Sequence, residues 1–209
     1  MLSYVEDVIA TGRLRVGDRL PAERDFATQL GVSRASVREA VRTLEAMGVV
    51  RTTAGHGPDG GTVLIPGSSS ALTRLLRMHI GMANFPMPDA IEARVMLERW
   101  SARLAAQFAT PEELDTISKT LASMDRPGIS REEFNNLDTR FHVEIAQAGH
   151  NRLIADMTTA IRDAMRWWIM HAFEEQQDWD EIAADLRQGH AEVFEAITTH
   201  RPVRAADRV

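Results

Sequence analysis

The sequence predicts a mostly α-helical protein with an N-terminal winged helix-turn-helix, whose wing is a small β-hairpin, and a C-terminal all-helical bundle. Residues 1–66 change pattern every few positions, in the order helix, helix-turn-helix and β-hairpin. From residue 74 onward the apolar residues recur at helical spacing to the end of the chain. Between these parts lies a short segment that opens with Gly-Ser-Ser-Ser and is typical of a linker. We therefore expect domains at 1–66 and 74–209, joined by a linker at 67–73.

The first part is expected to contain three short helices and a hairpin. The segment YVEDVIATG is a short amphipathic helix, and PAERDFATQLG is a second helix that closes on Gly31. Ser33 is placed to cap a third helix at 34–47, and Gly48 is placed to end it. The β-rich runs VVRTT and GTVLIP flank the glycine-loaded stretch AGHGPDGG, which predicts a hairpin.

The second part reads as helical throughout. Thr110 and Ser130 each open a capping-box pattern, and Asn151 is placed to cap a third long helix. We expect helices near 70–82, 88–109, 111–124, 131–149, 152–176 and 178–200. A further helix is expected to begin at the final RAADRV and to be incomplete.

The composition limits the classes of function. The chain has a net charge of −6, but residues 1–66 carry eight Arg and eight acidic residues, so the acidity belongs to the second part. The absence of cysteine excludes disulfides and thiolate metal sites, so a metal must be held by nitrogen and oxygen ligands. No apolar run approaches the roughly 20 residues of a membrane helix. We expect a cytoplasmic protein with no membrane partner.

The helix at 34–47 has an apolar face and a stripe of arginines. Arg34, Ser36 and Arg38 stand at its start, where a recognition helix needs long donors and small residues. Arg24, on the preceding helix, is placed to reach phosphate. These residues predict binding to double-stranded DNA.

The alternative interpretation is that the arginine stripe is simply a solvated helix face, on which the arginines pair with Glu39 and Glu45. The stripe alone favours that alternative. The hairpin and the small residues at the helix start reverse the preference.

A second group of residues suggests a metal site. Asp138 and His142 are spaced i, i+4, so they share a helix face beside an apolar stripe, and His190 has a similar position on a later helix. Such groups converging in a bundle form a nitrogen and oxygen site for Zn²⁺, Ni²⁺ or Mn²⁺. One alternative is that Asp138 and His142 form only a hydrogen bond with each other. Another is that His190 is a histidine of the apolar core. Trp167 and Trp168 are expected in the core, although they can also line a pocket, as can His150 and His171.

The segment GDRLPAERDFATQLGVSRASVREAVRTLEAMGVV, residues 17–50, resembles the N-terminal domain of GntR-family transcription regulators. The resemblance includes the Gly-Asp-x-Leu-Pro-x-Glu-Arg run, the Gly-Val-Ser-Arg-x-x-Val-Arg-Glu-Ala run and the Leu-x-x-x-Gly ending. It implies that operator DNA is contacted by Arg24, Ser33, Arg34, Ser36 and Arg38, with wing glycines at Gly55 and Gly57.

Residues 70–209 are similar to the FCD effector domain of FadR-type GntR regulators. The matching marks are Arg94 and Glu98, the Asp-x-x-Phe-His run at 138–142, Asn151 and His190. The resemblance implies a divalent metal held by one Asp and three His, of which Asp138, His142 and His190 match three. The fourth His of the family would fall just beyond Val209, and the alternative is that this member lacks that ligand. Arg94 is implied as the anchor for an effector carboxylate, with an i, i+4 ion pair to Glu98 as the alternative.

These expectations describe a regulator rather than an enzyme. We expect a homodimer that binds a pseudo-palindromic operator and responds to a small carboxylate, such as a sugar acid or an organic acid. One alternative is a sensor in which the metal ion itself is the signal. Another is a metal-dependent hydrolase, but no HExxH-like glutamate stands beside the Asp–His pair to act as its general base.

Overall fold

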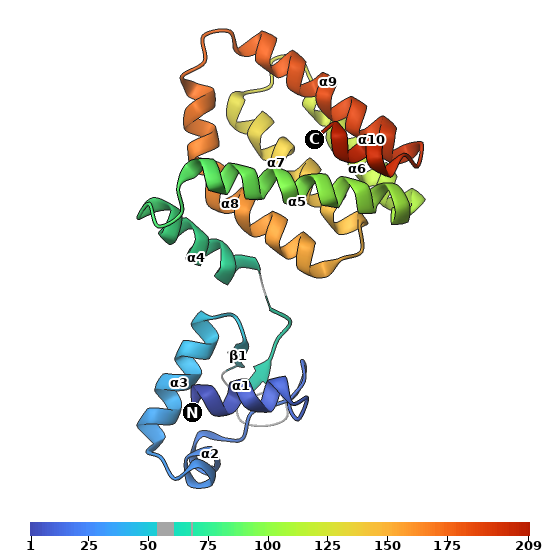
Figure 1. Ribbon diagram of the computed structural model, residues 1–209. Helices are drawn as coiled ribbons and strands as arrows, with labels where there is room; N and C mark the ends of the chain where they lie inside the picture. Colours follow the sequence, from blue (N-terminus) through green and yellow to red (C-terminus); the bar gives the residue numbers. More distant parts are fainter. Residues whose placement is uncertain (54–60, 68) are drawn as a thin grey trace. The chain divides into compact units, whose positions relative to one another are not determined.

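The computed structural model describes residues 1–53, 61–67 and 69–209. It divides into two compact units, Met1–Ala71 and Leu72–Val209. Both units consist mainly of helices, and the strands of the described residues pair in one antiparallel hairpin (Figure 1). This confirms the mostly α-helical class that the sequence predicts.

The first unit has the element order of a winged helix-turn-helix. Its elements are α1 (Leu2–Ala10), α2 (Glu23–Leu30), α3 (Arg34–Ala46), β1 (Val50–Thr53) and β2 (Gly61–Leu64). In the hairpin, Val50 pairs with Leu64, and both side chains are buried against the helices. Arg19, in the segment before α2, forms an additional bridge with Val63.

Helix α3 begins and ends as its sequence predicts. The hydroxyl of Ser33 accepts a hydrogen bond from the backbone N–H of Ser36 at 3.1 Å, which caps the helix. Val37 and Leu44 lie on the buried face of α3, in the core of this unit. Gly48 follows with a φ of +70°, a conformation that glycine adopts without strain.

The two glycines expected to contact DNA from the wing, Gly55 and Gly57, lie outside the described residues. The structure therefore describes the two strands of the hairpin and the segments on either side.

The second unit is a bundle of seven helices within the described residues. They are α4 (Ser69–Gly81), α5 (Met87–Phe108), α6 (Pro111–Met124), α7 (Arg131–Ala148), α8 (Arg152–Glu174), α9 (Trp179–Thr198) and α10 (Pro202–Asp207). Helix α4 begins inside the segment expected as a linker. Among these described helices, none is long and apolar enough to cross a membrane.

Short polar caps define where three of these helices begin. Thr110 and Glu113 form a reciprocal capping box at α6. Ser130 caps α7, and Asn151 caps α8 by accepting a hydrogen bond from a backbone N–H three residues later. Each of these caps matches the sequence pattern at 110, 130 and 151.

Helix α7 packs against α5, α6 and α8, while α9 closes the bundle against α5 and α6. Buried apolar side chains such as Phe134, Phe141, Ile145 and Ile197 fill the space between them. Figure 1 shows α5 crossing the front of the bundle, with α7 and α8 behind it. Side chains of α5, α7, α8 and α9 line a common cavity.

Candidate metal and effector site

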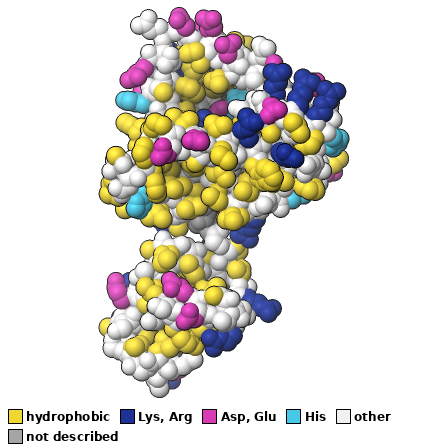
Figure 2. All heavy atoms as spheres, viewed as in Figure 1, with side chains coloured by type: hydrophobic (Ala, Val, Ile, Leu, Met, Phe, Trp, Pro, Cys, Tyr) yellow, Lys and Arg dark blue, Asp and Glu magenta, His cyan; other side chains and the backbone are white. Residues whose placement is uncertain are grey.

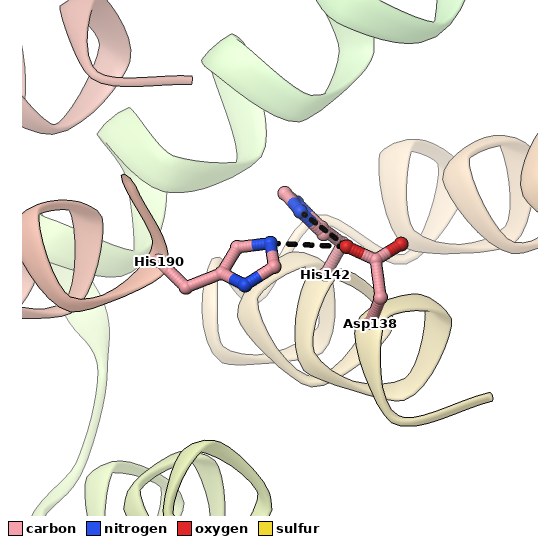
Figure 3. Close-up of side chains that lie close together, drawn as sticks. All are labelled: Asp138, His142 and His190. Atoms are coloured by element: carbon pink, nitrogen blue, oxygen red, sulfur yellow. Dashed lines mark ion pairs between the residues drawn. The ribbon is translucent and has the colours of Figure 1, made fainter. Parts of the chain in front are cut away.

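Asp138, His142 and His190 converge inside the helical bundle (Figure 3). The Nε2 atom of His190 lies 3.0 Å from Oδ1 of Asp138, and the Nε2 atom of His142 lies 3.8 Å from the same oxygen. All three side chains are buried. One potential ligand atom from each residue falls within 4.8 Å of the others.

The apolar pattern of two helices produces this convergence. On α7, Asp138 and His142 flank Phe141, which is fully buried and therefore fixes the inward face of the helix. On α9, His190 precedes the buried Val193 by three residues, so both lie on the inward face. The structure thus brings together the three residues that the sequence selects.

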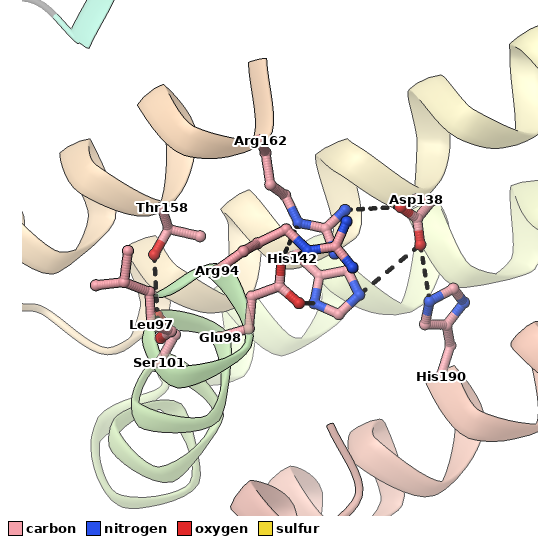
Figure 4. Close-up of polar contacts among 9 residues, drawn as sticks. All are labelled: Arg94, Leu97, Glu98, Ser101, Asp138, His142, Thr158, Arg162 and His190. Carbon is pink, nitrogen blue, oxygen red and sulfur yellow. Dashed lines mark hydrogen bonds and ion pairs between the residues drawn. The ribbon is translucent and has the colours of Figure 1, made fainter. Parts of the chain in front are cut away.

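Arg162, on α8, completes the network, and the sequence analysis did not identify it. Its Nη1 donates to Oδ2 of Asp138 at 2.6 Å, and its Nε donates to Oε1 of Glu98 at 2.6 Å (Figure 4). The Arg162 side chain is only 2% exposed. Asp138 therefore has one oxygen bound to Arg162 and the other directed at the two imidazoles.

Glu98, on α5, connects the network to His142 and to Arg94. Its Oε2 lies 3.7 Å from Nδ1 of His142, and its Oε1 lies 3.4 Å from Nε of Arg94. The ion pair expected as the alternative role for Arg94 is therefore present. The buried Nε of Arg94 nevertheless has no hydrogen-bond acceptor among the described residues.

Burial and the neighbouring charges shift the pKa values of the network. Burial, assisted by the positive charge of Arg162, lowers the pKa of His142 to about 3, so its imidazole is neutral at physiological pH. Burial alone raises the pKa of Asp138. The charge of Arg162 and the hydrogen bond from His190 outweigh burial and hold that pKa well below its ordinary value. Burial also lowers the pKa of the Arg94 guanidinium.

The donor atoms fit a divalent metal ion. A carboxylate oxygen and two imidazole nitrogens are ligands for Zn²⁺, Ni²⁺ and Mn²⁺, and metal binding requires neutral imidazoles. Glu98 faces the second nitrogen of His142, an arrangement that orients histidine ligands in metal sites. The Nδ1 atom of His190 is buried without a hydrogen-bond partner among the described residues.

A cavity of about 450 Å³ adjoins these donor atoms. Its walls include Arg94, Trp168, Leu186 and Val209, together with the residues of the network. A volume of this size accommodates a small organic ligand. The cavity thus joins a possible metal site to the guanidinium of Arg94.

The other aromatic residues considered from the sequence lie in different places. Trp167 is 61% exposed, so the expectation of a core position is wrong for this residue. His171 stacks on Trp167 with a ring separation of 4.7 Å. His150 binds Glu113 at 3.0 Å, away from the cavity. Only Trp168 of the four lines the cavity.

The start of α3 presents the side chains expected to contact DNA. Arg34 and Ser36 are exposed, and the guanidinium of Arg34 has no hydrogen bond or ion pair with a described residue. Arg38 instead donates from Nη2 to Glu23 of α2 at 3.0 Å. Arg24 is exposed and contacts the neighbouring Asp25 at 3.2 Å.

If α3 merely exposed a solvated face, its arginines would pair with Glu39 and Glu45. These ion pairs are present only in part. Arg42 lies 3.6 Å from Glu39. Glu45 instead accepts a hydrogen bond from the backbone N–H of Thr52 at 2.8 Å, and so connects α3 to the hairpin. The arginine stripe is therefore not neutralised along its length by its own helix.

Comparison with known proteins identifies both units. Residues 89–209 match the model of the FCD domain, and residues 3–58 match that of the bacterial regulatory proteins of the gntR family. The chain belongs to the GntR family. It is a DNA-binding transcriptional regulator of the FCD type, as its sequence predicts.

Two relatives of this regulator are named for the control of operons. The Glc operon transcriptional activator of Escherichia coli K12 is 27% identical over 203 residues, covering 95% of this chain and 78% of the relative. The putative L-lactate dehydrogenase operon regulatory protein of the same strain is 31% identical over 201 residues, covering 92% of this chain and 74% of the relative. These relatives and domains are regulators rather than enzymes, so the metal-dependent hydrolase is set aside.

The fold is shared with a solved structure of Streptococcus agalactiae GntR. That structure matches with a TM-score of 0.66 and 23% sequence identity, covering 99% of this chain and 92% of the other. The likeness supports the fold of this regulator.

Proposed function

We propose that this regulator senses a small carboxylate that binds beside a divalent metal ion in the cavity of the helical bundle. The observation that carries the proposal is the convergence of Asp138, His142 and His190 in a cavity that Arg94 also lines. In this arrangement residues 1–66 bind DNA, residues 74–209 bind the effector, and residues 67–73 connect them.

Asp138, His142 and His190 are the proposed metal ligands. Arg162 holds Oδ2 of Asp138, so that Oδ1 is the oxygen left facing the imidazoles. When bound, Zn²⁺, Ni²⁺ or Mn²⁺ would supply positive charge and open coordination positions. An effector carboxylate is one group that would fill such a position.

Arg94 is the proposed second contact of the effector. Its guanidinium lines the cavity, and its Nε has no acceptor within hydrogen-bond geometry among the described residues. A guanidinium binds carboxylates with two parallel hydrogen bonds. A relative named for the L-lactate dehydrogenase operon accords with an organic acid as the effector.

The proposed DNA contacts lie on α3 and next to it. They comprise Arg24, Ser33, Arg34, Ser36 and Arg38, with Gly55 and Gly57 in the wing. Since one winged helix reads only a short half-site, we propose that the regulator binds a pseudo-palindromic operator as a homodimer. GntR regulators usually act as dimers, which supports this assembly.

Two measurements test the effector site. Metal content is determined by elemental analysis after purification in metal-replete buffer, and melting shifts are recorded with L-lactate, glycolate and gluconate. Wild type should contain metal, and at least one of these acids should raise its melting temperature. Arg94→Ala should keep the metal and lose the shift. Arg140→Ala, an exposed arginine on α7, is the matched control and should behave as wild type.

The same experiment separates the effector site from the metal site. A metal-free wild-type protein would exclude the metal site. A normal melting shift in Arg94→Ala would exclude the carboxylate contact while leaving the metal site intact.

A second candidate is a sensor for the metal ion itself. This candidate is favoured because the three ligand side chains lie close together and form the site without any organic group. Metal removal and restoration should then change operator affinity in the absence of any acid. An operator affinity that responds only to the acid would reject this candidate.

A further inference from the structure

A second hollow in the helical bundle is distinct from the proposed metal and effector site. Its volume is about 670 Å³, and residues of α4, α7 and α8 line it. Ile80 of α4 and Met165 of α8 belong to one buried apolar cluster, so these two helices pack together (Figure 1). Among the described residues, Trp168 is the one that lines both cavities. The second hollow has the size of a site for a small molecule.

Helical spacing brings polar side chains of two helices to the second hollow. On α8, Asp163, Met170 and Glu174 recur at intervals of seven and four residues, so they lie on one side of the helix. On α7, Glu132 and Asn135 are spaced i, i+3 and also share a side. The hollow therefore collects carboxylates and an amide from helices that are distant in the sequence.

The amide of Asn135 is buried in the wall of the hollow without a strong partner. Asn135 is 1% exposed, and its Oδ1 accepts no hydrogen bond from a described residue. Its Nδ2 has the sulfur of Met170 at 3.9 Å, and a thioether is a weak acceptor. Buried side-chain polar atoms usually have a partner, because a buried acceptor without a donor costs free energy. A ligand that donates a hydrogen bond from within the hollow would supply the missing partner.

Two opposite charges that line the hollow also have no close partner. No hydrogen bond or ion pair joins the carboxylate of Asp163 to a described residue. Burial raises the pKa of Asp163, although the positive charges of Arg166 and Arg77 act in the other direction. The guanidinium of Arg77, on α4, also forms no hydrogen bond or ion pair with a described residue. An ammonium group would suit Asp163, and a carboxylate would suit Arg77.

The mixture of charges in the hollow selects the class of ligand. Figure 2 shows hydrophobic side chains gathered over the face of the bundle that α5 crosses. The second hollow instead combines three carboxylates with two guanidiniums, those of Glu132, Asp163, Glu174, Arg77 and Arg166. Arg166 is already bound to Asn136, which leaves Arg77 as the available cation. A ligand with one charge would cover the opposite charge of the hollow without pairing it, whereas a zwitterion pairs both.

We propose that the second hollow binds a free α-amino acid with an apolar side chain. The ammonium group of the amino acid donates to Oδ1 of Asn135 and to the carboxylate of Asp163. Its carboxylate accepts from the guanidinium of Arg77, and its side chain packs on Trp168 and Met170. No proposed metal ligand lines this hollow. The inference therefore goes beyond the proposed function and does not depend on it.

Isothermal titration calorimetry of the full-length protein tests the proposal with L-leucine, L-methionine, L-phenylalanine and L-tryptophan. At least one of these probes should bind with a Kd below about 1 mM. The probe that binds is then compared with the amine that lacks its carboxylate and the acid that lacks its ammonium group. For L-phenylalanine these compounds are phenethylamine and 3-phenylpropanoate. Each should bind about 10-fold more weakly or worse, because one charged hydrogen bond is lost.

Two substitutions locate the site. Asp163→Asn and Asn135→Leu should each weaken binding of the probe by about 10-fold or more. Asn135→Leu replaces a buried amide that lacks a partner with an apolar side chain of similar size, so the protein should still fold. Asp156→Asn is the matched control, since Asp156 is on α8 but pairs with Arg152 and does not line the hollow. It should bind the probe as wild type does.

Two further samples distinguish the second hollow from the effector cavity, where an amino acid could also bind a metal ion. Arg94→Ala and chelator-treated wild type should both bind the probe with unchanged affinity, because neither change affects the lining of the second hollow. Loss of binding in either sample, with normal binding by Asp163→Asn, would assign the probe to the effector cavity and overturn the proposal.

The proposal is also overturned if none of the four amino acids binds at up to about 10 mM. Normal affinity in both Asp163→Asn and Asn135→Leu would overturn it too, as would equal affinity for the amino acid and its amine or acid counterpart. Far-UV circular dichroism shows whether Asn135→Leu has kept its fold. If it has not, Asp163→Asn alone decides the outcome.

Discussion

The carboxylate of Asp138 has two different neighbours because Arg162 binds only one of its oxygens. The Nη1 atom of Arg162 donates to Oδ2 at 2.6 Å, while Oδ1 faces His190 at 3.0 Å. The same guanidinium holds Glu98 at 2.6 Å. Arg162 therefore compensates two buried carboxylates at once and directs one of them toward the proposed metal position.

Replacing Arg162 with methionine should destabilise the metal-free protein by about 3–5 kcal/mol, because two buried carboxylates lose their shared counter-charge. The measurement is the free energy of unfolding in urea after chelator treatment. Arg166→Met is the matched control, since Arg166 lies one turn later on α8, is exposed and contacts Asn136. Its cost should be below about 1 kcal/mol. Equal losses in the two variants would contradict the role assigned to Arg162.

Replacing His190 with alanine should abolish tight metal binding. Only Asp138 and His142 would remain at the site, and two ligands hold a divalent ion poorly. Metal affinity is measured by competition with a chromophoric chelator, and the expected loss is well above the roughly 10–100-fold typical of outer contacts. His171→Ala removes an exposed histidine outside the cavity and should bind metal as wild type does. Wild-type affinity in His190→Ala would remove this residue from the site.

The convergence of the three proposed ligands could be predicted because it depends on local patterns. The i, i+4 spacing of Asp138 and His142, beside an apolar stripe, places both on the inward face of a helix. The role of Arg162 could not be predicted in this way, since its partners lie on two other helices. A signal was nevertheless present, because Arg162 falls within a buried stripe that includes Thr158 and Met165. A charged residue in such a stripe needs partners of opposite charge.

The exposure of Trp167 could not be predicted from the type of residue. Its size and apolarity predict burial, yet it is exposed, because α8 turns its Ala164 and Met165 side inward. Helical periodicity establishes which residues share a face. It does not establish how wide the buried face is.

Because of the capping box of α6, the stability of the folded protein should vary with pH in the acidic range. Burial alone raises the pKa of Glu113, but the backbone N–H of Thr110 at 2.8 Å and the ring of His150 outweigh it and lower that pKa below 4.5. A carboxyl group with a lowered pKa in the folded state stabilises the protein above its unfolded pKa. This contribution should be present above pH 4.5 and should be lost as the pH falls through the folded pKa.

Glu113→Gln tests this dependence, because glutamine keeps an acceptor for the capping box but carries no charge. Melting temperatures of wild type and variant are compared from pH 7 to pH 3. The difference between them should be largest near neutrality and should shrink below pH 4.5. A difference that is constant over the whole range would show that the ionised carboxylate of Glu113 contributes nothing.

Replacing Arg34 with alanine should weaken sequence-specific DNA binding. Arg34 lies exposed at the first position of α3, and no described residue holds its guanidinium, so it is available for a base edge. A bidentate arginine–guanine contact contributes about 1–3 kcal/mol of discrimination against the wrong base.

To test this prediction, the binding sequence is first selected from a randomised duplex pool, and mobility shifts then compare that sequence with an unrelated duplex. Arg34→Ala should lose affinity for the selected sequence and change little on the unrelated one. Arg42→Ala, later on the same helix and next to Glu39, serves as the control and should have the smaller effect on the selected sequence. Equal losses on both duplexes would assign Arg34 to phosphate, and an unchanged affinity would remove it from the interface.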